Sequence, residues 1–443
     1  MAVLVILCSM TPPKPKQVSK FAPDILRKTI PQTLERHYSM MSYDGHDGGC
    51  PGCKSDHVVG FGWLPKTFCT IITEKGGFED VNVRVKRYLC MHCKHTFLAT
   101  DSPFYDGCRY GKPIVDLCLA LAASNPYNRV ESILMQYGIQ VDRDTVKRYA
   151  LAFRNRATKK AGIPVMDNAK IGVNILKLLF DIENVKELKQ KYLKAKYDSV
   201  MDETYPRKKG AKKALAKERY IRSVTGEKQP KFPDSFTLAS SYMNHLECFS
   251  SIACRNSSFN SIVAETLAKP LIGSDAIVTD GSRCYDSVRS YYCLFHKMGN
   301  FFAKDPFLNR QRSDESLPWC VLSSYMEEIY SFAKTECEEW LKTRYPDLVD
   351  SETGKYIGAT TTNAMEGGNW RMKYELRSSY QNVESIESRC ILMALKDSLQ
   401  TFKEGKPHLS FANINGRFDF QGTMEEKKTT TIAGEPVEKY IYR

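Results

Sequence analysis

The sequence lacks the features that mark membrane proteins and secreted disulfide scaffolds. None of its apolar runs approaches the roughly 18 residues that a membrane-spanning helix needs. Met1–Cys8 is apolar but short, with neither a basic leading region nor a clear cleavage site, so no signal peptide is expected. The 15 cysteines are odd in number and scattered over 443 residues, which does not suit a disulfide framework. These absences favour a reducing, cytoplasmic compartment and argue against a membrane protein.

What the composition provides is length and positive charge. A chain of 443 residues is long enough for two or three domains, each with its own core. A hydrophobic content of 42% and a charged content of 26% are those of a globular protein. The formal net charge of +13 favours a polyanionic partner, either nucleic acid or an acidic membrane surface.

Residues 1–40 have little periodicity and are expected to form a loose leader, and two cysteine pairs follow it. Each Cys-x-x-Cys places two thiolates on a tight turn, and two such turns complete a tetrahedral zinc site, here from Cys50, Cys53, Cys90 and Cys93. Between the pairs, Val81–Tyr88 alternates as a strand of a zinc ribbon would. The alternatives are buried free thiols, or ligation that uses His57, Cys69, His92 or His95. We expect one structural Zn²⁺ in a ribbon at residues 41–110.

The spacing of the two pairs is unusual. Residues 54–89 separate them, and these 36 residues exceed the usual spacing of roughly 15–20. The ribbon is therefore expected to carry an insertion around residues 60–77.

Three short helices are expected at residues 111–165. Pro113–Ala123 is apolar, Asn128 and Glu131 form a capping-box pattern, and Gly138 precedes a third helix that Asp142 caps. This pattern predicts a helix-turn-helix. On the third helix, basic residues lie away from the apolar stripe, as on a recognition helix that faces DNA: Arg143, Lys147 and Arg154. An ordinary helical hairpin with a solvated basic face is the alternative.

The next segments are a predicted amphipathic connecting helix at residues 168–196 and a strongly basic stretch. Pro206–Phe232 holds ten Lys or Arg and two Glu. Such a run is often a solvated loop. This stretch closely follows Asp202, which is a candidate catalytic carboxylate, so we expect its lysines to contact phosphates. These are Lys208, Lys209, Lys212 and Lys213.

Three carboxylates are candidates for one site. The apolar run that begins at Ala276 reads as a buried strand, and it ends at Asp280. Asp202 lies upstream, within the stretch Tyr197–Tyr205, and Glu366 lies in a later predicted helix. The simpler alternatives are an Asp-Gly turn at Asp280 and a helix-capping role for Glu366. Asp198 is an alternative to Asp202.

The predicted order of elements favours an RNase H-like fold for residues 190–405. Strands at 235–244 and 248–254 and a helix at 260–268 lie between the segments that carry Asp202 and Asp280. A helical insertion is expected at about 305–355, and a helix at 360–376 carries Glu366. The tail at 406–443 has weak periodicity and is expected to be peripheral.

In this order, the motifs resemble the zinc-ribbon DDE transposases of prokaryotic insertion sequences. The motifs are Cys-Pro-x-Cys with Cys-x-x-Cys, the helix-turn-helix, Asp-Glu-Thr-Tyr at 202–205, Thr-Asp-Gly-x-x-x-Tyr at 279–285 and Thr-Asn-x-x-Glu at 362–366. The resemblance implies a multidomain α/β chain with a zinc ribbon, a helix-turn-helix and an RNase H-like domain. The 85 residues at 281–365 form a longer spacing than in relatives of this kind, which bears on the subfamily more than on the class.

The resemblance also implies an activity. Asp202, Asp280 and Glu366 would hold two Mg²⁺ (or Mn²⁺) ions, which activate the attacking oxygen and stabilise the leaving oxygen. Water would cut the transposon end, and the freed 3′-hydroxyl would attack target DNA, in the nucleoid and as a homodimer or higher oligomer. Lys373 is a candidate phosphate contact, and Trp370 would stack on an unpaired base or pack in the core. A catalytically inactive DNA-binding regulator and a nuclease without strand transfer are the alternatives.

Overall fold

The computed structural model describes most of the chain and divides it into two compact units. The described residues are 24–163, 172–181, 199–206, 236–244, 246–255, 261–268, 277–286, 288–294, 296–298, 319–376, 382–401, 411–416, 424–432 and 435–442. One unit comprises Met1–Phe153 with Ser410–Arg443, and the other comprises Arg154–Leu409. The chain is a mixed α/β protein with more than one sheet.

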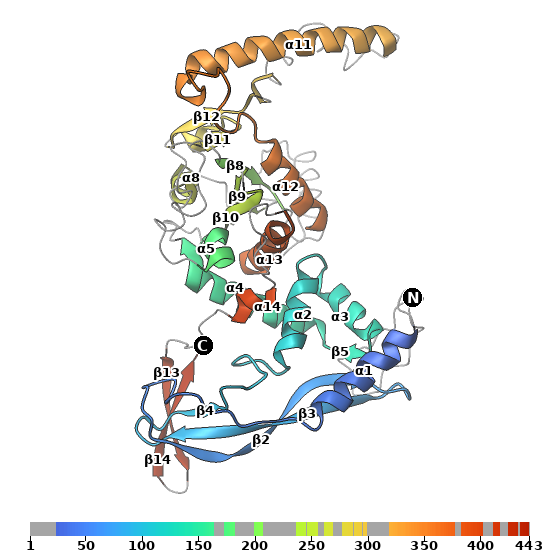
Figure 1. The fold of residues 1–443 in the computed structure, drawn as a ribbon, viewed down its shortest axis with the longest axis vertical. Coiled ribbons are helices and arrows are strands. Elements are labelled where there is room, and N and C mark those ends of the chain that lie inside the picture. Colours follow the sequence, from blue (N-terminus) through green and yellow to red (C-terminus); the bar gives the residue numbers. More distant parts are fainter. Residues whose placement is uncertain are drawn as a thin grey trace, which may run out of the picture. The chain divides into compact units, whose positions relative to one another are not determined.

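A long hairpin dominates the sheet of the first unit (Figure 1). Strands β2 (Val58–Ile72) and β3 (Phe78–Cys90) pair in antiparallel fashion from Val58 opposite Cys90 to Ile72 opposite Phe78. The short strands β1 (Ser42–Tyr43), β4 (Thr96–Leu98) and β5 (Ile139–Gln140) extend this sheet. The alternation expected at Val81–Tyr88 is confirmed at Val81, Val83 and Val85, which are buried. The extra residues between the cysteine pairs therefore lengthen the hairpin.

The helices of the first unit are α1 (Asp24–Tyr38), α2 (Lys112–Ala122), α3 (Tyr127–Gln136), the start of α4 (Arg143–Ala161) and α14 (Phe411–Gly416). The described tail also holds the hairpin β13 (Met424–Ile432) and β14 (Glu435–Tyr442). The predicted α4 cap is present, because Asp142 accepts a 2.8 Å hydrogen bond from the backbone N–H of Thr145. The predicted α4 stripe of Val146, Tyr149, Ala150 and Phe153 is buried.

Three predictions for this unit are wrong. The Asn128–Glu131 capping box does not form, because α3 already begins at Tyr127, after Pro126, without a side-chain cap. The leader contains helix α1, whose Tyr38 stacks on Phe68 with ring centroids 3.6 Å apart. In the tail, Phe411 packs edge-on against Phe153, so the described α14 segment is part of the core.

A seven-stranded sheet forms the second unit, in the order β12-β11-β8-β9-β10-β7-β6. Its strands are β6 (Gly162–Ile163), β7 (Gly172–Asn174), β8 (Ser199–Thr204), β9 (Thr237–Met243), β10 (Cys248–Arg255), β11 (Ile277–Thr279) and β12 (Ser290–Tyr292). Strands β8, β11 and β12 are parallel to one another, whereas β8, β9 and β10 are antiparallel neighbours. The predicted strands at 235–244 and 248–254 and the predicted helix at 260–268 are present as β9, β10 and α8 (Ser261–Ala268).

Helices cover both faces of this sheet (Figure 1). Helix α8 and the 3-10 helix η1 (Arg283–Tyr285) lie on one face, where Met201, Ala239, Ala253 and Leu267 share a core. Helices α12 (Asn363–Glu375) and α13 (Val383–Thr401) cover the other face. The expected insertion between β12 and α12 contains α11 (Trp319–Arg344) and η2 (Pro346–Leu348).

The predicted connecting helix at 168–196 is wrong in its described part. This part begins as strand β7 and then forms the six-residue helix α5 (Ile175–Phe180). Asn174 caps α5, and Asp181 ends it in the left-handed region at φ 54°. The other parts of the predicted helix, 168–171 and 182–196, lie outside the described residues. Within the described chain, no helix is both long and apolar enough to cross a membrane.

An ion pair between α4 and α13 gives a stability prediction for the second unit. The Nε atom of Arg154 donates to Oε2 of Glu387 at 2.7 Å, and the two side chains are only 12% and 0% exposed. Replacing Glu387 with Leu leaves a buried guanidinium without its partner and should lower the free energy of unfolding by about 3–5 kcal/mol. Thermal unfolding followed by circular dichroism measures this change. The matched substitution Asp144→Leu, which removes the partner of exposed Arg143, should change it by less than about 1 kcal/mol. Equal effects of the two substitutions on the free energy of unfolding would contradict a buried Arg154–Glu387 ion pair.

Candidate metal and carboxylate sites

Four cysteines meet at the open end of the β2–β3 hairpin. The sulfur atoms of Cys50, Cys53, Cys90 and Cys93 all lie within 4.8 Å of one another. The Cys50–Cys93 and Cys53–Cys90 sulfur pairs are 3.5 and 3.6 Å apart, and all four cysteines are free thiols. Four sulfurs that surround zinc at about 2.3 Å are separated by about 3.8 Å, so the cluster fits a tetrahedral Zn²⁺.

The two halves of the cluster have the same backbone geometry. In each half the residue after the second cysteine adopts a left-handed conformation, Lys54 at φ 59° and Lys94 at φ 60°. The N–H of Lys54 donates to the carbonyl of Cys50, and the N–H of Lys94 donates to that of Cys90. This turn directs backbone N–H groups at the first sulfur of each pair, and those from Cys93 and His92 lower the pKa of Cys90 to about 6. Burial raises the pKa of Cys93 to about 12. A divalent cation would relieve this contrast by favouring four thiolates.

The alternative ligands are not part of this cluster. Cys69 is buried in strand β2, where burial raises its pKa to about 12. The only metal-sized group of sulfur, imidazole or carboxylate ligands in the described chain is the four-cysteine group. His57, His92 and His95 therefore stay outside it.

We expect about one Zn²⁺ per chain in freshly purified protein, because four preorganised sulfurs bind this ion more strongly than other divalent ions of similar availability. Elemental analysis and titration of accessible thiols measure it. Cys90→Ser should lose the metal, whereas Cys69→Ser should keep it. Metal-free protein with all four thiols reactive would contradict the assignment.

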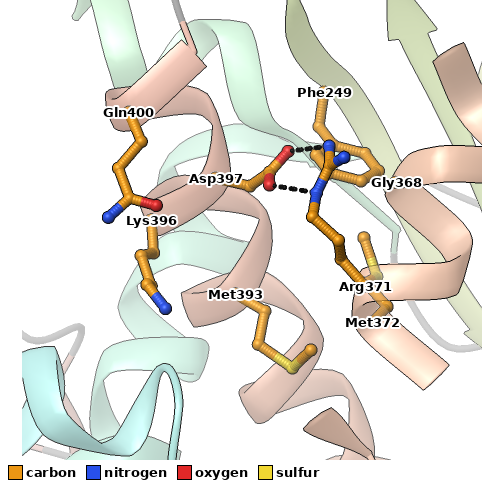
Figure 2. Close-up of a pocket in the computed structure, with 8 residues that line it drawn as sticks. All are labelled: Phe249, Gly368, Arg371, Met372, Met393, Lys396, Asp397 and Gln400. Carbon is orange, nitrogen blue, oxygen red and sulfur yellow. Dashed lines mark hydrogen bonds and ion pairs between the residues drawn. The ribbon is translucent and has the colours of Figure 1, made fainter. Parts of the chain in front are cut away.

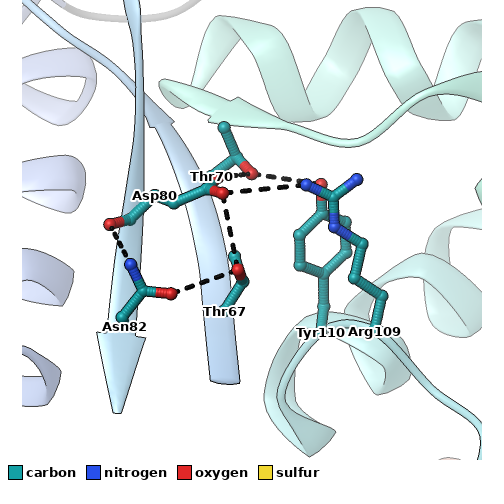
Figure 3. Close-up of polar contacts among 6 residues, drawn as sticks. All are labelled: Thr67, Thr70, Asp80, Asn82, Arg109 and Tyr110. Atoms are coloured by element: carbon teal, nitrogen blue, oxygen red, sulfur yellow. Dashed lines mark hydrogen bonds and ion pairs between the residues drawn. The ribbon is translucent and has the colours of Figure 1, made fainter. Parts of the chain in front are cut away.

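A network on the sheet joins the hairpin to the segment that precedes α2 (Figure 3). The Thr70 hydroxyl donates to Asp80 at 2.6 Å and also lies 3.1 Å from the Tyr110 hydroxyl. The backbone N–H of Tyr110 in turn donates to the hydroxyl of Tyr149 on α4. The cysteine cluster and the α2–α4 helices thus belong to one packed unit.

Two of the predicted carboxylates lie side by side in the second unit. Parallel strands β11 and β8 pair with Ile277 opposite Ser199 and Val278 opposite Val200. Continued by two residues, this register puts Asp280 beside Asp202, and their charges interact. Asp280 follows the last residue of β11, where its Oδ1 accepts a hydrogen bond from the N–H of Ser282. Asp198, the alternative, lies outside the described residues.

Asn369 of α12 binds Asp202 directly. Its Nδ2 donates to Oδ2 of Asp202 at 2.8 Å, while its Oδ1 accepts from the hydroxyl of Ser240 on β9 at 3.1 Å. Burial raises the pKa of Asp202 to about 6, against the opposing effect of the Asn369 hydrogen bond, and the charges of Glu203 and Asp280 raise it further. A nearby cation would therefore stabilise the charged form of Asp202.

The beginning of α12 is fixed close to the end of β11. The backbone N–H of Cys293 donates to the carbonyl of Thr279, the residue before Asp280. The sulfur of Cys293 then accepts hydrogen bonds from the N–H and the hydroxyl of Thr362, which precedes α12. Glu366 lies in the first turns of this helix, three residues before Asn369. Its side chain is outside the described part of the structure, so its meeting with the two aspartates stays a prediction.

The opposite face of β8 holds a residue whose role the sequence did not reveal. Glu203 accepts hydrogen bonds from the hydroxyls of Tyr285 at 2.6 Å and Tyr205 at 3.1 Å. Tyr205 ends the motif Asp-Glu-Thr-Tyr and Tyr285 ends the motif Thr-Asp-Gly-x-x-x-Tyr, and these motifs were the sequence signal that could have pointed to Glu203.

Gly281 directly follows Asp280. It has φ +80°, and a Cβ at this position would come within 2.0 Å of the Tyr292 ring. The turn after Asp280 therefore requires glycine.

The predicted DNA-binding residues differ in their exposure and contacts. Arg143 is exposed and pairs with its neighbour Asp144, and Lys147 is half-buried on α4. Arg154 does not face a groove, because the Glu387 ion pair holds its guanidinium inside the second unit. Trp370 is 65% exposed and is not a core residue. The side chains of Lys208, Lys209, Lys212, Lys213 and Lys373 lie outside the described residues.

A small pocket lies between α12, α13 and β10 (Figure 2). Its volume is about 70 Å³. Arg371 and Asp397 both line it, and the guanidinium of Arg371 donates hydrogen bonds of 2.7 and 2.9 Å to the carboxylate of Asp397. Phe249 and Met372 supply apolar walls. None of its lining residues is a predicted catalytic carboxylate, and its size suits a few water molecules. The pocket is therefore not the candidate catalytic site.

No family model and no curated protein matches this sequence. Among solved structures, the Drosophila P element transposase strand transfer complex is similar to 71% of this chain over 87% of its own, with 9% sequence identity and a TM-score of 0.27. This TM-score is too low for the likeness to indicate a function.

The raised pKa of Asp202 predicts a pH dependence of stability. Because the folded protein holds this proton more tightly than the unfolded chain, the free energy of unfolding should fall as pH rises from about 4 to about 6, by up to about 3 kcal/mol. Asp202→Asn should remove this fall and, in metal-free buffer at pH 7.5, should unfold at a higher temperature than the native sequence. Parallel melts at several pH values measure the difference. Identical pH profiles for the two proteins would contradict the assigned pKa.

Proposed function

We propose that this protein is a DNA transposase that cuts transposon ends and joins them to target DNA with three carboxylates, Asp202, Asp280 and Glu366. The observation that carries the proposal is the placement of Asp202 beside Asp280 on parallel strands, under a helix that holds Asp202 through Asn369 and carries Glu366. The Thr279–Cys293–Thr362 contacts support a position of Glu366 near the same end of the sheet.

The topology supports an RNase H-like reading of the second unit. Strands β10, β9, β8, β11 and β12 are adjacent in that order, and the helix α8 falls between the third and fourth strands in sequence. In sequence order, Asp202 lies on the first strand of this set, β8, and Asp280 directly follows the fourth strand, β11. The insertion with α11 follows the fifth strand and precedes α12.

Each candidate residue would have its own part in the reaction or in DNA binding. Two Mg²⁺ ions held by the three carboxylates would supply an activated oxygen nucleophile and charge relief for the leaving 3′-oxygen. Asn369 orients Asp202, and the turn at Gly281 orients Asp280. The high pKa of Asp202 fits a residue that awaits a cation. In the first unit, the zinc ribbon and exposed α4 residues such as Arg143 would bind duplex DNA at the transposon ends.

Replacement of the carboxylates tests this function. On a labelled duplex with the inverted repeat that flanks the gene, Asp202→Ala, Asp280→Ala and Glu366→Gln should each reduce Mg²⁺-dependent cleavage by about 10³-fold or more. End binding should stay nearly unchanged, because the recognition elements belong to the other unit. The exposed neighbour Asp286 provides a matched control, and Asp286→Ala should cut normally.

The assay also separates the alternatives. The double variant Asp202→Ala/Asp280→Ala should be little worse than either single variant, because residues that act as a unit are not additive. Binding without any metal-dependent cleavage by the native sequence would identify a DNA-binding regulator. Cleavage without joining of a pre-cut end to a plasmid would identify a nuclease. Full activity of Glu366→Gln would remove Glu366 from the site.

A further inference from the structure

The zinc end of the β2–β3 hairpin exposes aromatic rings among cations. We call Trp63, Arg84 and Lys86, which share one face of the hairpin, the aromatic–cation strip. Phe61 and Trp63 are 44% and 40% exposed, although rings of this size are usually buried in a sheet of a stable protein. Both charged members are cations, and no ion pair joins them to an acidic side chain within the described residues.

A bulge produces this arrangement. Gly60 pairs with Tyr88 and Trp63 pairs with Lys86, so Phe61 and Gly62 together oppose the single residue Arg87. Gly62 takes φ +88°, a conformation that glycine adopts without strain. Phe61 lies at Arg87, whose guanidinium carbon is 5.2 Å from the ring centroid, and strand alternation puts this pair on the face opposite to Trp63 and Lys86.

Cations flank the second ring as well. The guanidinium carbon of Arg84 lies 5.1 Å from the Trp63 centroid, and the ammonium of Lys86 lies 5.8 Å from it. The Lys86 ammonium also lies 5.5 Å from the ring of Tyr88. Cation–π contacts at exposed sites are weak, so they do not by themselves explain why a ring as large as that of Trp63 stays exposed to water. A ligand that uses both the ring and the charges explains the arrangement better.

We infer that the aromatic–cation strip binds single-stranded nucleic acid. Every unpaired base has a flat face that stacks on Trp63, and each phosphate carries a charge that Arg84 and Lys86 complement. A duplex hides its base faces within its own stack, so it can use the cations but not the ring. The inference deepens the proposed function, on which it rests for the source of the strand: DNA ends opened around the cut.

The strip is anchored by the cysteine cluster. Val58 pairs with Cys90, so the bulge begins two residues along β2 from the zinc ligands. Zinc would thus fix the register of the strands that present the rings. Loss of the metal should weaken strand binding even though no strip residue is a ligand.

Binding of the full-length protein to fluorescent oligonucleotides tests the inference, measured by anisotropy without Mg²⁺ so that nothing is cut. Trp63→Ala should weaken binding of a 12-nucleotide single strand by about tenfold and binding of the same sequence as a duplex by less than about twofold. Trp63→Phe should retain most of the affinity. Arg84→Gln with Lys86→Gln should weaken both ligands and reduce the salt dependence.

Phe78 provides the matched control, because it is 41% exposed at the other end of the same hairpin. Phe78→Ala should bind both ligands normally. Unchanged single-strand affinity of zinc-loaded Trp63→Ala, or equal losses on strand and duplex, would overturn the inference. Should Trp63→Ala lose zinc, the comparison of Trp63→Phe with Trp63→Leu decides in the same way. Because no cleavage is measured, a protein that never cuts DNA but binds strands through Trp63 would refute the proposed function and leave this inference intact.

Discussion

The parallel pairing of β8 with β11 is the constraint on which the second unit depends. This register puts two carboxylates next to each other, an arrangement that is electrostatically unfavourable without a cation. The surrounding contacts hold the arrangement in place against that repulsion. Asn369 binds Asp202 from one side, and the left-handed Gly281 with the Ser282 N–H fixes Asp280. The raised pKa of Asp202 is a consequence of burial, and the repulsion between Asp202 and Asp280 contributes to it.

Strand alternation lets β8 serve two layers at once. Asp202 faces α12, whereas its neighbour Glu203 points to the face that carries η1 and is held there by Tyr285. Tyr285 is almost fully buried and follows Asp280 by five residues. The two aspartate-bearing segments are therefore joined twice, by the main-chain register on the sheet and by the Tyr285–Glu203 hydrogen bond beneath it. A shift of either segment would break both contacts.

Periodicity and turn signals predicted the strands β9, β10 and β11 and the helix α8, because these elements have clear apolar patterns between breakers. The same local signals failed where a distant segment decides the outcome. Arg154 has the spacing of an exposed helical face, but its partner Glu387 comes from a helix more than 200 residues later, and α13 itself was not predicted. Asn369 was missed for a similar reason, since an amide in a helix reveals nothing until the strand beneath it is known. The Asn128 cap failed because Pro126 already starts the helix.

The long spacing between the cysteine pairs has a physical meaning that the sequence alone leaves open. A compact ribbon needs only a short connection between its two metal-binding turns, so the additional residues must form structure of their own. They extend β2 and β3 into a hairpin that is closed by the cysteine cluster at one end and packed through Thr70, Tyr110 and Tyr149 onto α4 at the other. Fixed at both ends, the hairpin can keep a bulge and two exposed rings in a defined geometry. Without the cysteine turns, the strands near Gly60 would have few contacts to prevent a slip in register. The four-cysteine cluster is thus best understood as the element that holds the exposed end of the hairpin in register.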